Sequence, residues 1–316
     1  MAKSKSGVAT VDKLSFGYRF KSDLRKNYSL YLLILPVIAF YIIFCYKPMY
    51  GALIAFKDYQ PSLGVFGSEW VGLYHFKRFF DNPDFVRIVK NTLTISITNI
   101  IFGFPAPIIL ALLFNELKLA KFKSVAQTIS YLPHFVSMVV VCGLIKTFVS
   151  QGGIILQIVT ALGGKQVGLL SRPEAFVPIY VISGIWQEIG WGSIIYLAAL
   201  SSIDQELYEA ARIDGANKWR QVIHITIPGI LPTIIIMLIL KMGSLLSVGY
   251  EKVILLYNPL IYETSDIIST YTYRVGLEQQ DWSYSSAVGL LNSAINFLMV
   301  VVTNKISAKC SETSLW

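Results

Sequence analysis

The feature that most constrains this chain is a series of long apolar runs. A membrane-spanning helix needs about 20 consecutive, mainly apolar residues. Six runs approach or exceed that length, at roughly 29–46, 91–114, 125–149, 176–200, 229–256 and 284–303. Only 15% of the 316 residues are charged and 54% are hydrophobic, which is the composition of a membrane protein rather than of a soluble domain. We therefore expect an all-α integral membrane protein with six transmembrane helices.

Basic residues set the expected orientation. Four segments, 1–27, 116–123, 202–228 and 304–316, together hold 15 Lys and Arg in 75 residues. The three alternating segments, 47–88, 150–175 and 258–282, hold 8 in 93. The positive-inside rule then places both termini and the 202–228 loop in the cytoplasm. The first apolar run has no A-x-A-like cleavage site after it, so we expect a retained helix rather than a signal peptide.

The net charge of +8 does not indicate nucleic-acid binding, because the basic residues flank apolar runs and form no stripe interleaved with aromatics. The basic N-terminal segment is interpreted as an orientation signal or a strip that binds lipid headgroups, with a docking element as the alternative. The cysteines Cys45, Cys142 and Cys310 suggest no disulfide framework.

Segment 47–88 is rich in aromatic, Gly and Pro residues. Its clustered aromatics suit an elbow in the outer interface of the membrane, with a docking surface as the alternative; they are Trp70, Tyr74, Phe76, Phe79 and Phe80. In the following apolar run, Pro105 and Pro107 predict a bent helix.

A charged, ordered stretch, "YEAARIDGANKWRQVIHITIPGILP" at 208–232, separates the fourth and fifth runs. Ser202 and Gln205 have the spacing of a capping box, so a helix is expected to begin near residue 203. Gly215 can end that helix in the left-handed conformation, and Asn217 can cap a second helix that Pro228 stops.

The two predicted helices differ in their faces. The first has a small apolar face flanked by charge; the face is Leu207, Ala210 and Ala211, and the flanks are Glu206, Glu209 and Arg212. The second carries a stripe that is expected to pack on the membrane bundle, formed by Trp219, Val222, Ile223 and Thr226. The residues alone leave two alternatives open: a compact knob that docks in the cytosol, or an ordinary amphipathic connector along the membrane.

"EAARIDGANKWRQVIHITIPGILP" resembles the EAA loop of the permease subunits of binding-protein-dependent ABC importers. The matching positions are Glu209, Ala210, Ala211, Asp214, Gly215, Ala216, Ile225 and Pro228, with Ile227 where Leu is usual. The resemblance extends over about 88–303. Further stretches, "WVGLYHFKRFF", "YLPHFVS", "IWQEIGWGSIIYLAAL" and "ETSLW", are similar to sugar-importer permeases of the complex-oligosaccharide branch.

The resemblance implies a type I ABC importer permease fold and four regions. These are a basic cytoplasmic segment 1–28, a first helix with an outer aromatic segment 29–87, a permease core 88–303 containing the coupling loop 202–228, and a cytoplasmic tail 304–316. It also implies that the loop seats in an ATP-binding subunit. Because the chain has no G-x-x-x-x-G-K-[ST] sequence, ATP and Mg would be bound by partner subunits and this chain would hold no cofactor.

The partners implied by the resemblance are a second homologous permease, two ATP-binding cassette subunits, an extracytoplasmic sugar-binding protein, an oligosaccharide and membrane lipid. The implied location is the bacterial cytoplasmic membrane, crossed several times. We expect a transporter subunit and not an enzyme.

Polar residues inside apolar runs are the candidates for the substrate pathway, because a charge that faces lipid is costly. Glu188 is the first candidate, on a helical face shared with Gly184, Gln187, Trp191 and Ile195; a helix-packing hydrogen bond is the alternative role. Further candidates are Tyr196, Ser244, Tyr250, Glu251, Asn292 and Asn296. Lys146, Lys241 and Lys252 are either partners of these groups or reach to the interfaces.

Two other classes of protein are weighed. A secondary, ion-coupled carrier would typically show more spans or inverted repeats, and it needs no charged coupling knob. An intramembrane enzyme is disfavoured because the three histidines, His75, His134 and His224, are far apart in the sequence and are predicted on the outer segment, the third span and the cytosolic loop.

Overall fold

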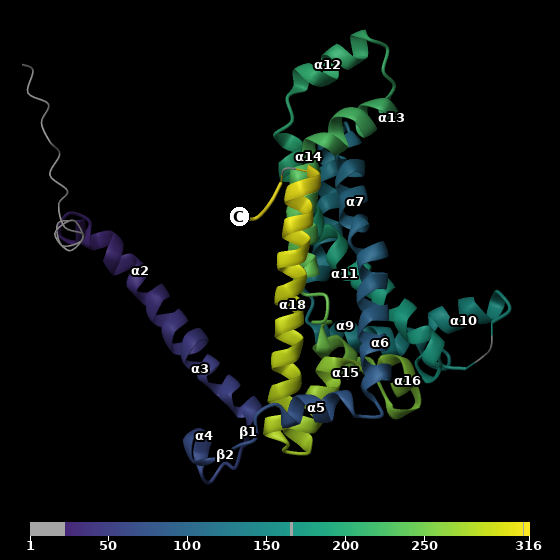
Figure 1. The fold of residues 1–316 in the computed structure, drawn as a ribbon. Helices are drawn as coiled ribbons and strands as arrows, with labels where there is room; N and C mark the ends of the chain where they lie inside the picture. The colour runs from purple at the N-terminus through teal and green to yellow at the C-terminus, as the bar shows by residue number, and fades with distance from the viewer. Residues whose placement is uncertain (1–22, 165–166, 312) are drawn as a thin grey trace, which may run out of the picture. The chain divides into compact units, whose positions relative to one another are not determined.

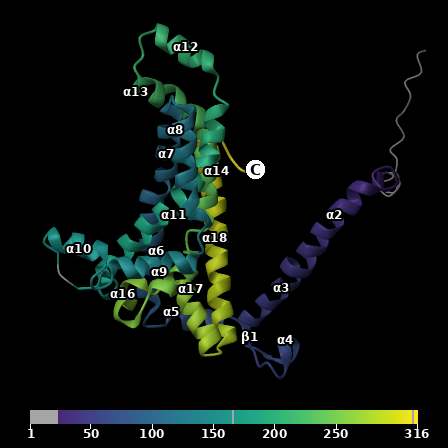
Figure 2. The same ribbon diagram turned by 180° about the vertical axis from the view of Figure 1, so that it is seen from behind.

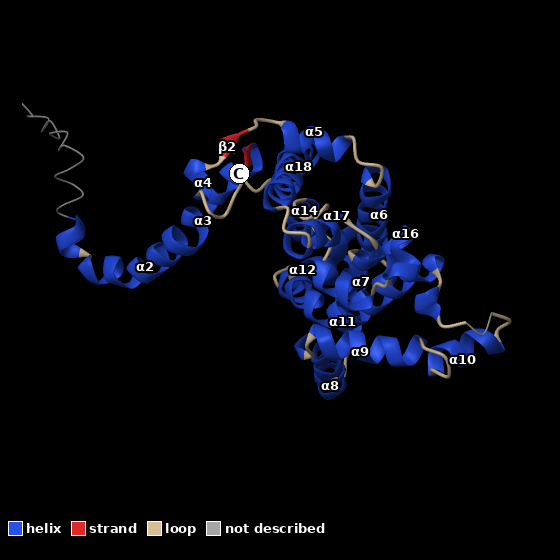
Figure 3. Cartoon of the chain, turned by 90° about the horizontal axis from the view of Figure 1, so that it is seen from below, coloured by secondary structure: helices blue, strands red, loops and turns tan. Residues whose placement is uncertain are grey.

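The computed structural model describes residues 23–164, 167–311 and 313–316, which are mostly helical (Figure 3). Most of the expected basic N-terminal segment, residues 1–22, lies outside the described residues. The chain divides into two compact units, residues 1–53 and 54–316.

The first unit contains the start of a long apolar helix. Its elements are the α-helix α2 (Tyr28–Phe40), the π-helical turn η1 (Tyr41–Tyr46) and the short helix α3 (Lys47–Met49). The 3-10 helix η2 (Tyr50–Phe56) follows at the junction of the two units. Together these elements make one candidate membrane span, Tyr28–Phe56, which is longer than the predicted run at 29–46.

The second unit is a helical bundle with one small antiparallel hairpin, in which Lys57 pairs with Trp70 and Asp58 with Glu69. Its outer segment contains β1 (Lys57–Asp58), α4 (Gly64–Gly67), β2 (Glu69–Trp70) and α5 (Tyr74–Phe80). Its first half continues with α6 (Phe85–Thr98), η3 (Asn99–Gly103), α7 (Pro105–Glu116), α8 (Ala120–Tyr131), η4 (Leu132–Phe135), α9 (Met138–Val149), α10 (Ile154–Ala161) and η5 (Leu169–Ser171).

The second half of this unit begins with the longest central helix, α11 (Pro173–Ser201). It continues with α12 (Gln205–Ile213), α13 (Lys218–Gln221), η6 (Val222–Thr226), α14 (Ile227–Met242), α15 (Tyr250–Leu256), η7 (Pro259–Ile261), α16 (Tyr262–Ser265), α17 (Ile268–Tyr273), η8 (Arg274–Glu278) and α18 (Trp282–Ser311). Figures 1 and 2 show α12 and α13 at one end of the bundle and α5 with α16 and α17 at the other.

Five helices in the described part of the chain are long and apolar enough to cross a membrane: Tyr28–Phe56, Phe85–Glu116, Met138–Ala161, Lys218–Met242 and Trp282–Lys309. Helix α11 has 29 residues but does not meet the same apolar criterion. The polar pair Gln187 and Glu188 near its middle lowers its hydropathy. Helix α11, which covers the predicted fourth run at 176–200, is therefore long enough to cross a membrane but has a partly polar sequence.

The prediction of one continuous helix at 125–149 is wrong. Helix α8 ends at Tyr131, the 3-10 turn η4 contains Pro133, and a new helix begins at Met138. Ser137 caps this new helix, because its Oγ accepts a hydrogen bond from the Val140 amide at 3.4 Å. A proline and a good N-cap within five residues thus end one helix and start another.

The prediction of one helix at 229–256 is also wrong. Helix α14 ends at Met242, and α15 begins at Tyr250 after a non-helical stretch, Gly243–Gly249. The buried Asn296 of α18 supports this stretch: its Oδ1 accepts from the Leu246 amide at 2.9 Å, and its Nδ2 donates to Ser247 Oγ at 2.8 Å. Ser96 of α6 donates a further hydrogen bond to the Leu245 carbonyl. These side chains satisfy backbone groups that a helix would otherwise pair internally.

Two proline positions are accommodated by π-helical turns. The turn η3 lies just before Pro105, at the position where a bend was expected in the second run. The turn η6 lies before Pro228, and the helix continues through it from Lys218 to Met242. Pro228 therefore does not stop the second loop helix as predicted, because the π-helical turn η6 directly before it lets the helix continue past a residue that has no amide to donate.

Helix α11 packs closely on its neighbours through two glycines. A Cβ at Gly190 would lie 2.0 Å from the Ser130 carbonyl oxygen of α8, and one at Gly192 would lie 3.0 Å from Pro107 of α7. Only glycine fits at the first position without a shift of backbone. Small residues at helix contacts are the usual means of close packing in membranes.

A buried charge network fixes the end formed by α6, α16 and α17. Asp266 is fully buried and receives two hydrogen bonds from Arg274, at 3.2 and 2.7 Å, and one from Thr270 at 2.9 Å. Burial by itself would lower the pKa of Arg274, but its hydrogen bonds and charge attraction to Asp266 outweigh this and raise the pKa. Asn91 of α6 donates to the Asp266 and Glu263 carbonyls at 3.0 and 2.9 Å.

The outer aromatic segment is partly buried and partly exposed. Phe79 is 2% exposed and belongs to a core shared with α6, α17 and α18, whereas Trp70, Tyr74 and Phe80 are more than half exposed. Trp70 stacks on Phe56 with ring centroids 5.6 Å apart. The structure thus joins one aromatic to the core and leaves three available to an interface, and both interpretations of the segment remain open.

Candidate functional site

The loop between α11 and α14 contains the helices α12 and α13, and α12 has well-formed ends. Asp204, not Ser202, is the N-cap of α12, because its Oδ1 accepts from the Glu206 amide at 3.0 Å. The predicted capping box is therefore wrong: the Ser202 hydroxyl donates to the Ala199 carbonyl, within the last turn of α11. Helix α12 begins at Gln205, two residues later than predicted.

The end of α12 is a Schellman motif centred on Gly215. The Ala216 amide donates to the Ala211 carbonyl at 2.8 Å, and the Gly215 amide donates to the Arg212 carbonyl at 3.1 Å. Gly215 has φ +75°, so the predicted left-handed glycine is confirmed. The chain then turns, and the predicted cap at Asn217 is also confirmed, since its Oδ1 accepts from the Arg220 amide at 2.9 Å.

Two hydrogen bonds join parts of this loop to each other, and one ion pair joins the loop to the bundle. The Tyr208 hydroxyl of α12 is hydrogen-bonded to Thr226 Oγ1 at 3.0 Å, and Gln221 Nε2 donates to the Ala216 carbonyl at 2.8 Å. Lys218 forms an ion pair with Glu116, at the end of α7, at 2.7 Å. The hydrogen bonds connect α12 and the turn at Ala216 to α13 and η6, and the ion pair connects α13 to the end of α7, while α12 projects (Figure 1).

The exposed faces of the loop differ from part of the prediction. No residue of α12 is buried, and Glu209, Ala210 and Asp214 are exposed. Ala211 and Ala216 are half-buried, and Gly215 is exposed. The predicted packing stripe on the second helix is wrong in two positions: Trp219 is 76% exposed and Ile223 is 54% exposed. Of the other two stripe residues, Thr226 is buried and Val222 is half-buried, and Gln221, outside the stripe, is buried as well. The π-helical turn η6 changes the helical register there, so a stripe drawn at α-helical spacing does not follow one face.

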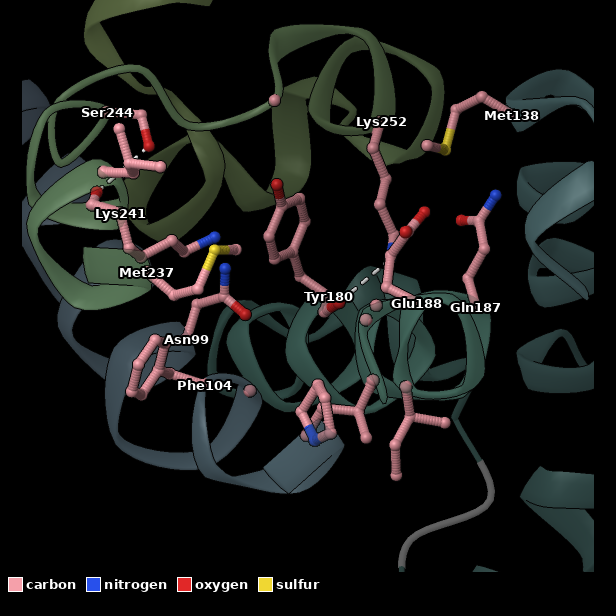
Figure 4. Close-up of a pocket in the computed structure, with 18 of the residues that line it drawn as sticks. Asn99, Phe104, Met138, Tyr180, Gln187, Glu188, Met237, Lys241, Ser244 and Lys252 are labelled. Carbon is pink, nitrogen blue, oxygen red and sulfur yellow. Dashed lines mark hydrogen bonds between the residues drawn. The ribbon is translucent and has the colours of Figure 1, made fainter. Parts of the chain in front are cut away.

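A central cavity of about 630 Å³ lies between η3, α7, α9, α11, α14 and α15. This volume is within the range of roughly 300–1,000 Å³ found for ligand pockets. The polar side chains in its lining, most of them labelled in Figure 4, are Asn99, Tyr180, Gln187, Glu188, Tyr196, Lys241, Ser244, Glu251 and Lys252. Apolar and glycine residues fill the gaps between them, including Gly184 and Gly192 of α11.

The structure brings together five of the nine predicted pathway residues. Gln187, Glu188, Tyr196, Ser244 and Glu251 line the cavity, and Gly184 from the same predicted face does so too. Four residues are placed outside this lining: Trp191, Tyr250, Asn292 and Asn296. Tyr250 stacks on Tyr273 with centroids 6.3 Å apart, and Asn292 is half-buried with no partner found for its Oδ1 among the described residues.

Glu188 faces two ways. It lines the cavity, and its Oε2 lies 3.0 Å from Nδ1 of His134, in the break between α8 and α9. The His134 ring stacks on Trp191 with centroids 4.5 Å apart and a 2° angle between the planes. The two roles considered for Glu188, cavity lining and helix packing, therefore occur together. Its neighbour Gln187 is buried, and its Nε2 donates to the Val136 carbonyl at 3.4 Å.

Sequence reasoning missed two cavity residues and left two lysines unassigned. Asn99 is a polar residue within the apolar stretch "ITNIIFGF", which is the signal that could have found it. Tyr180 gave no such signal, because tyrosines are frequent in this chain. Lys241 and Lys252 line the cavity, whereas Lys146 is exposed and lies beside a different hollow near Tyr257.

No group of three or more His, Cys, Asp or Glu side chains within residues 23–164, 167–311 and 313–316 could hold a metal ion. His75, His134 and His224 lie on α5, η4 and η6, and each contacts a different group: Lys57 carbonyl, Glu188 and Arg220 carbonyl.

The sequence of this chain is similar to those of known transport proteins. Residues 96–310 match the family described as "Binding-protein-dependent transport system inner membrane component". Protein LplB of Bacillus subtilis (strain 168) is 45% identical over 99% of this chain and 98% of its own length. The polygalacturonan/rhamnogalacturonan transport system permease protein YteP of the same organism is 45% identical over 91% of this chain and 90% of its own.

A solved structure agrees with these sequence relatives. One chain of a bacterial alginate ABC transporter, crystallised in complex with an alginate pentasaccharide-bound periplasmic protein, superposes with a TM-score of 0.86 and 42% identity. The match covers 94% of this chain and 100% of that one. On these matches the chain belongs to the family of binding-protein-dependent transport system inner membrane components.

Proposed function

We propose that this chain is one of two permease subunits of an ATP-driven oligosaccharide importer. Among the relatives named above, YteP is named for the transport of polygalacturonan and rhamnogalacturonan, and the solved transporter is named for alginate. An arabinooligosaccharide permease of Bacillus subtilis is 26% identical over 89% of this chain. The cavity offers amide, hydroxyl and charged groups in a bundle that is otherwise apolar, which suits a hydroxyl-rich ligand.

The observation that carries the proposal is the connection between loop and cavity. Helix α11 lines the cavity through Glu188 and Tyr196 and ends at the loop. Helix α14 begins after the loop and reaches the cavity at Lys241. A force applied to α12 is therefore delivered to two cavity walls through continuous helices.

In this proposal the 202–228 loop seats in an ATP-binding subunit, which binds ATP and Mg. Glu209 makes a charge-assisted contact with a basic group there, and the Ala210–Ala211 face allows close approach. Asp214, Gly215 and Ala216 form the sharp exit of the helix. A second permease and a second ATP-binding subunit complete the complex, and an extracytoplasmic binding protein delivers the sugar.

The proposed orientation follows the distribution of basic residues. The α12 end faces the cytoplasm of a bacterium, both termini lie on the same side, and the α5, α16 and α17 end faces outward. Helix α11 also crosses the membrane in this proposal, which brings the number of spans to six. Its polar residues Gln187 and Glu188 are tolerated because Glu188 faces the cavity and Gln187 is buried against the Val136 carbonyl.

The test is uncoupling without loss of assembly. Glu209→Lys and Gly215→Pro are expected to abolish sugar uptake into proteoliposomes that contain the whole complex, while the chain remains inserted. Gly215→Pro cannot adopt φ +75° and removes an amide that bonds to Arg212. Lys118→Glu, an exposed charge reversal in the neighbouring loop, is the control and should transport. Normal uptake by both loop variants would show that the loop does not couple to the ATPase.

A further inference from the structure

Two lysines in the central cavity lack an ionic partner. Lys252 is 4% exposed; its Nζ donates to the Tyr180 carbonyl at 3.0 Å and lies 4.9 Å from the centre of the Tyr180 ring. Lys241 lines the same cavity from the end of α14. Neither ammonium forms a salt bridge with any carboxylate of the described residues.

The acidic groups of the cavity do not neutralise these lysines directly. The Glu188 carboxylate is engaged by His134 at 3.0 Å. Glu251 lies in the first turn of α15, where it is exposed and favourably placed at the positive end of the helix dipole. A cation held in a low-dielectric bundle without a close counter-charge is costly, and such charges are retained mainly where a ligand uses them.

The two ammonium groups are arranged around a common space. In Figure 4, Lys241 comes from α14 on one side of Tyr180 and Lys252 from α15 on the other. The Lys252 ammonium lies over Gly184, whose absent side chain leaves room; a Cβ there would be 3.4 Å from Nζ. Hydrogen-bonding groups that suit hydroxyls, Asn99 and Ser244, lie in the same lining.

We propose that Lys241 and Lys252 bind carboxylate groups of the transported sugar, so that this cavity selects acidic, uronate-type oligosaccharides over neutral ones. The inference rests on the proposed function and names its substrate class. Each lysine offers a charged donor to one carboxylate, and such hydrogen bonds are about twice as strong as neutral ones. The neutral groups around them then bind the hydroxyls that acidic and neutral sugars share.

Direct binding to the complete complex tests this without the selectivity of a binding protein. The two permeases with their ATP-binding subunits are placed in lipid nanodiscs, and binding is measured by calorimetry. The probes are trigalacturonate, trimannuronate and the same trisaccharides with their carboxyl groups reduced to alcohols. The wild type is expected to bind at least one acidic probe about 10-fold or more tightly than its reduced form, as expected when a hydrogen bond to a charged group is lost.

Variants then assign the effect to the two side chains. Lys241→Gln and Lys252→Gln should each weaken binding of the acidic probe about 10-fold or more and leave the reduced probe unchanged. Lys241→Arg should retain most of the affinity, and Lys146→Gln, which removes an exposed lysine outside the cavity, should bind as the wild type does. Co-purification of the ATP-binding subunits shows that each variant is assembled.

The outcomes separate this inference from the proposed function. If the wild type binds reduced and acidic probes equally, or if both glutamine variants keep the preference for acid, the lysines do not select carboxylates, while sugar binding still supports an oligosaccharide permease. If the wild type binds none of the four probes, the acidic-substrate inference fails by itself, because the uncoupling test of Glu209 and Gly215 judges the importer function independently.

Discussion

The two ends of the larger unit are built in opposite ways. At the α5–α16–α17 end, Asp266 is fully buried and bonded to Arg274 and Thr270, and Asn91 joins this network to α6. At the α12 end, no residue of α12 is buried, and its side chains reach the bundle chiefly through Tyr208. One end therefore holds several helices in fixed relation, whereas the other presents a well-capped helix on few supports, as expected of a part that docks and moves.

The strongest test of this contrast is Asp266→Ala. Removing one member of a buried, hydrogen-bonded ion pair leaves Arg274 uncompensated, and the cost is expected to be about 3–5 kcal/mol. Thermal unfolding of the purified protein in nanodiscs measures this loss. Asp214→Ala, an exposed aspartate at the α12 end, is the matched control and should change the midpoint little. Equal effects of the two variants would mean that the ends do not differ in this way.

A smaller effect is expected between the two ends, at Asn296. Asn296→Leu leaves the Leu246 amide and the Ser247 hydroxyl without their partner, and a buried unsatisfied group costs about 1–3 kcal/mol. Because Ser244 of the same non-helical stretch lines the cavity, sugar binding should weaken as well. Binding and unfolding are measured on the same preparation. Ser293→Ala on the exposed face of α18 serves as control, and a variant at 296 that behaves like it would show that Gly243–Gly249 supports itself.

At the α12 end, Gly215→Ala is expected to have a local effect. Alanine at φ +75° costs roughly 1–2 kcal/mol, which falls on the last turn of α12 rather than on the whole bundle. Hydrogen exchange should accelerate at Gly215-adjacent amides, notably that of Ala216, and remain unchanged at α6 and α17. Gly51→Ala, at a glycine with ordinary φ and open space around it, is the comparison. Acceleration throughout the bundle would contradict an independently supported α12.

The smallest effect is expected for Lys218→Gln. Its ion pair with Glu116 is short, at 2.7 Å, but both side chains are largely exposed, and such pairs contribute about 0–1 kcal/mol. Unfolding should hardly change, and any effect on uptake should weaken further at high salt. A loss of stability as large as that of Asp266→Ala would show that this exposed tether carries the α12 end.

The features that sequence reasoning predicted are those encoded by neighbouring residues. Gly215 and Asn217 were found because a left-handed turn and a helix cap each depend on residue types within a few positions. The interruptions at Pro133–Ser137 and Gly243–Gly249 were missed, because the apolar residues on both sides keep the mean hydropathy of each run high across the break. The side chain that supports the second break, Asn296, is also distant in the sequence. The mean hydropathy of a segment indicates whether the segment lies in a membrane, but it does not show whether the segment is helical throughout.

The cavity residues likewise show what could and could not be predicted from the sequence. Glu188 and Ser244 were predicted because polar residues are conspicuous in apolar runs, and both line the cavity. Trp191 shares a helical face with Glu188 and yet stacks on His134 outside the lining, since the break in the third run brings His134 to that place. Which side of a helix meets a cavity depends on neighbours that periodicity alone does not reveal.

The division between loop and cavity has a consequence for how such proteins diversify. In the proposed function, the residues that contact the ATP-binding subunit form one contiguous stretch, the 202–228 loop. The cavity draws Asn99, Lys241 and Lys252 from three separate helices, so its chemistry can be altered one codon at a time. Because no residue of the 202–228 loop lines the cavity, the proposed function would allow one ATP-binding subunit to serve permeases with different substrates.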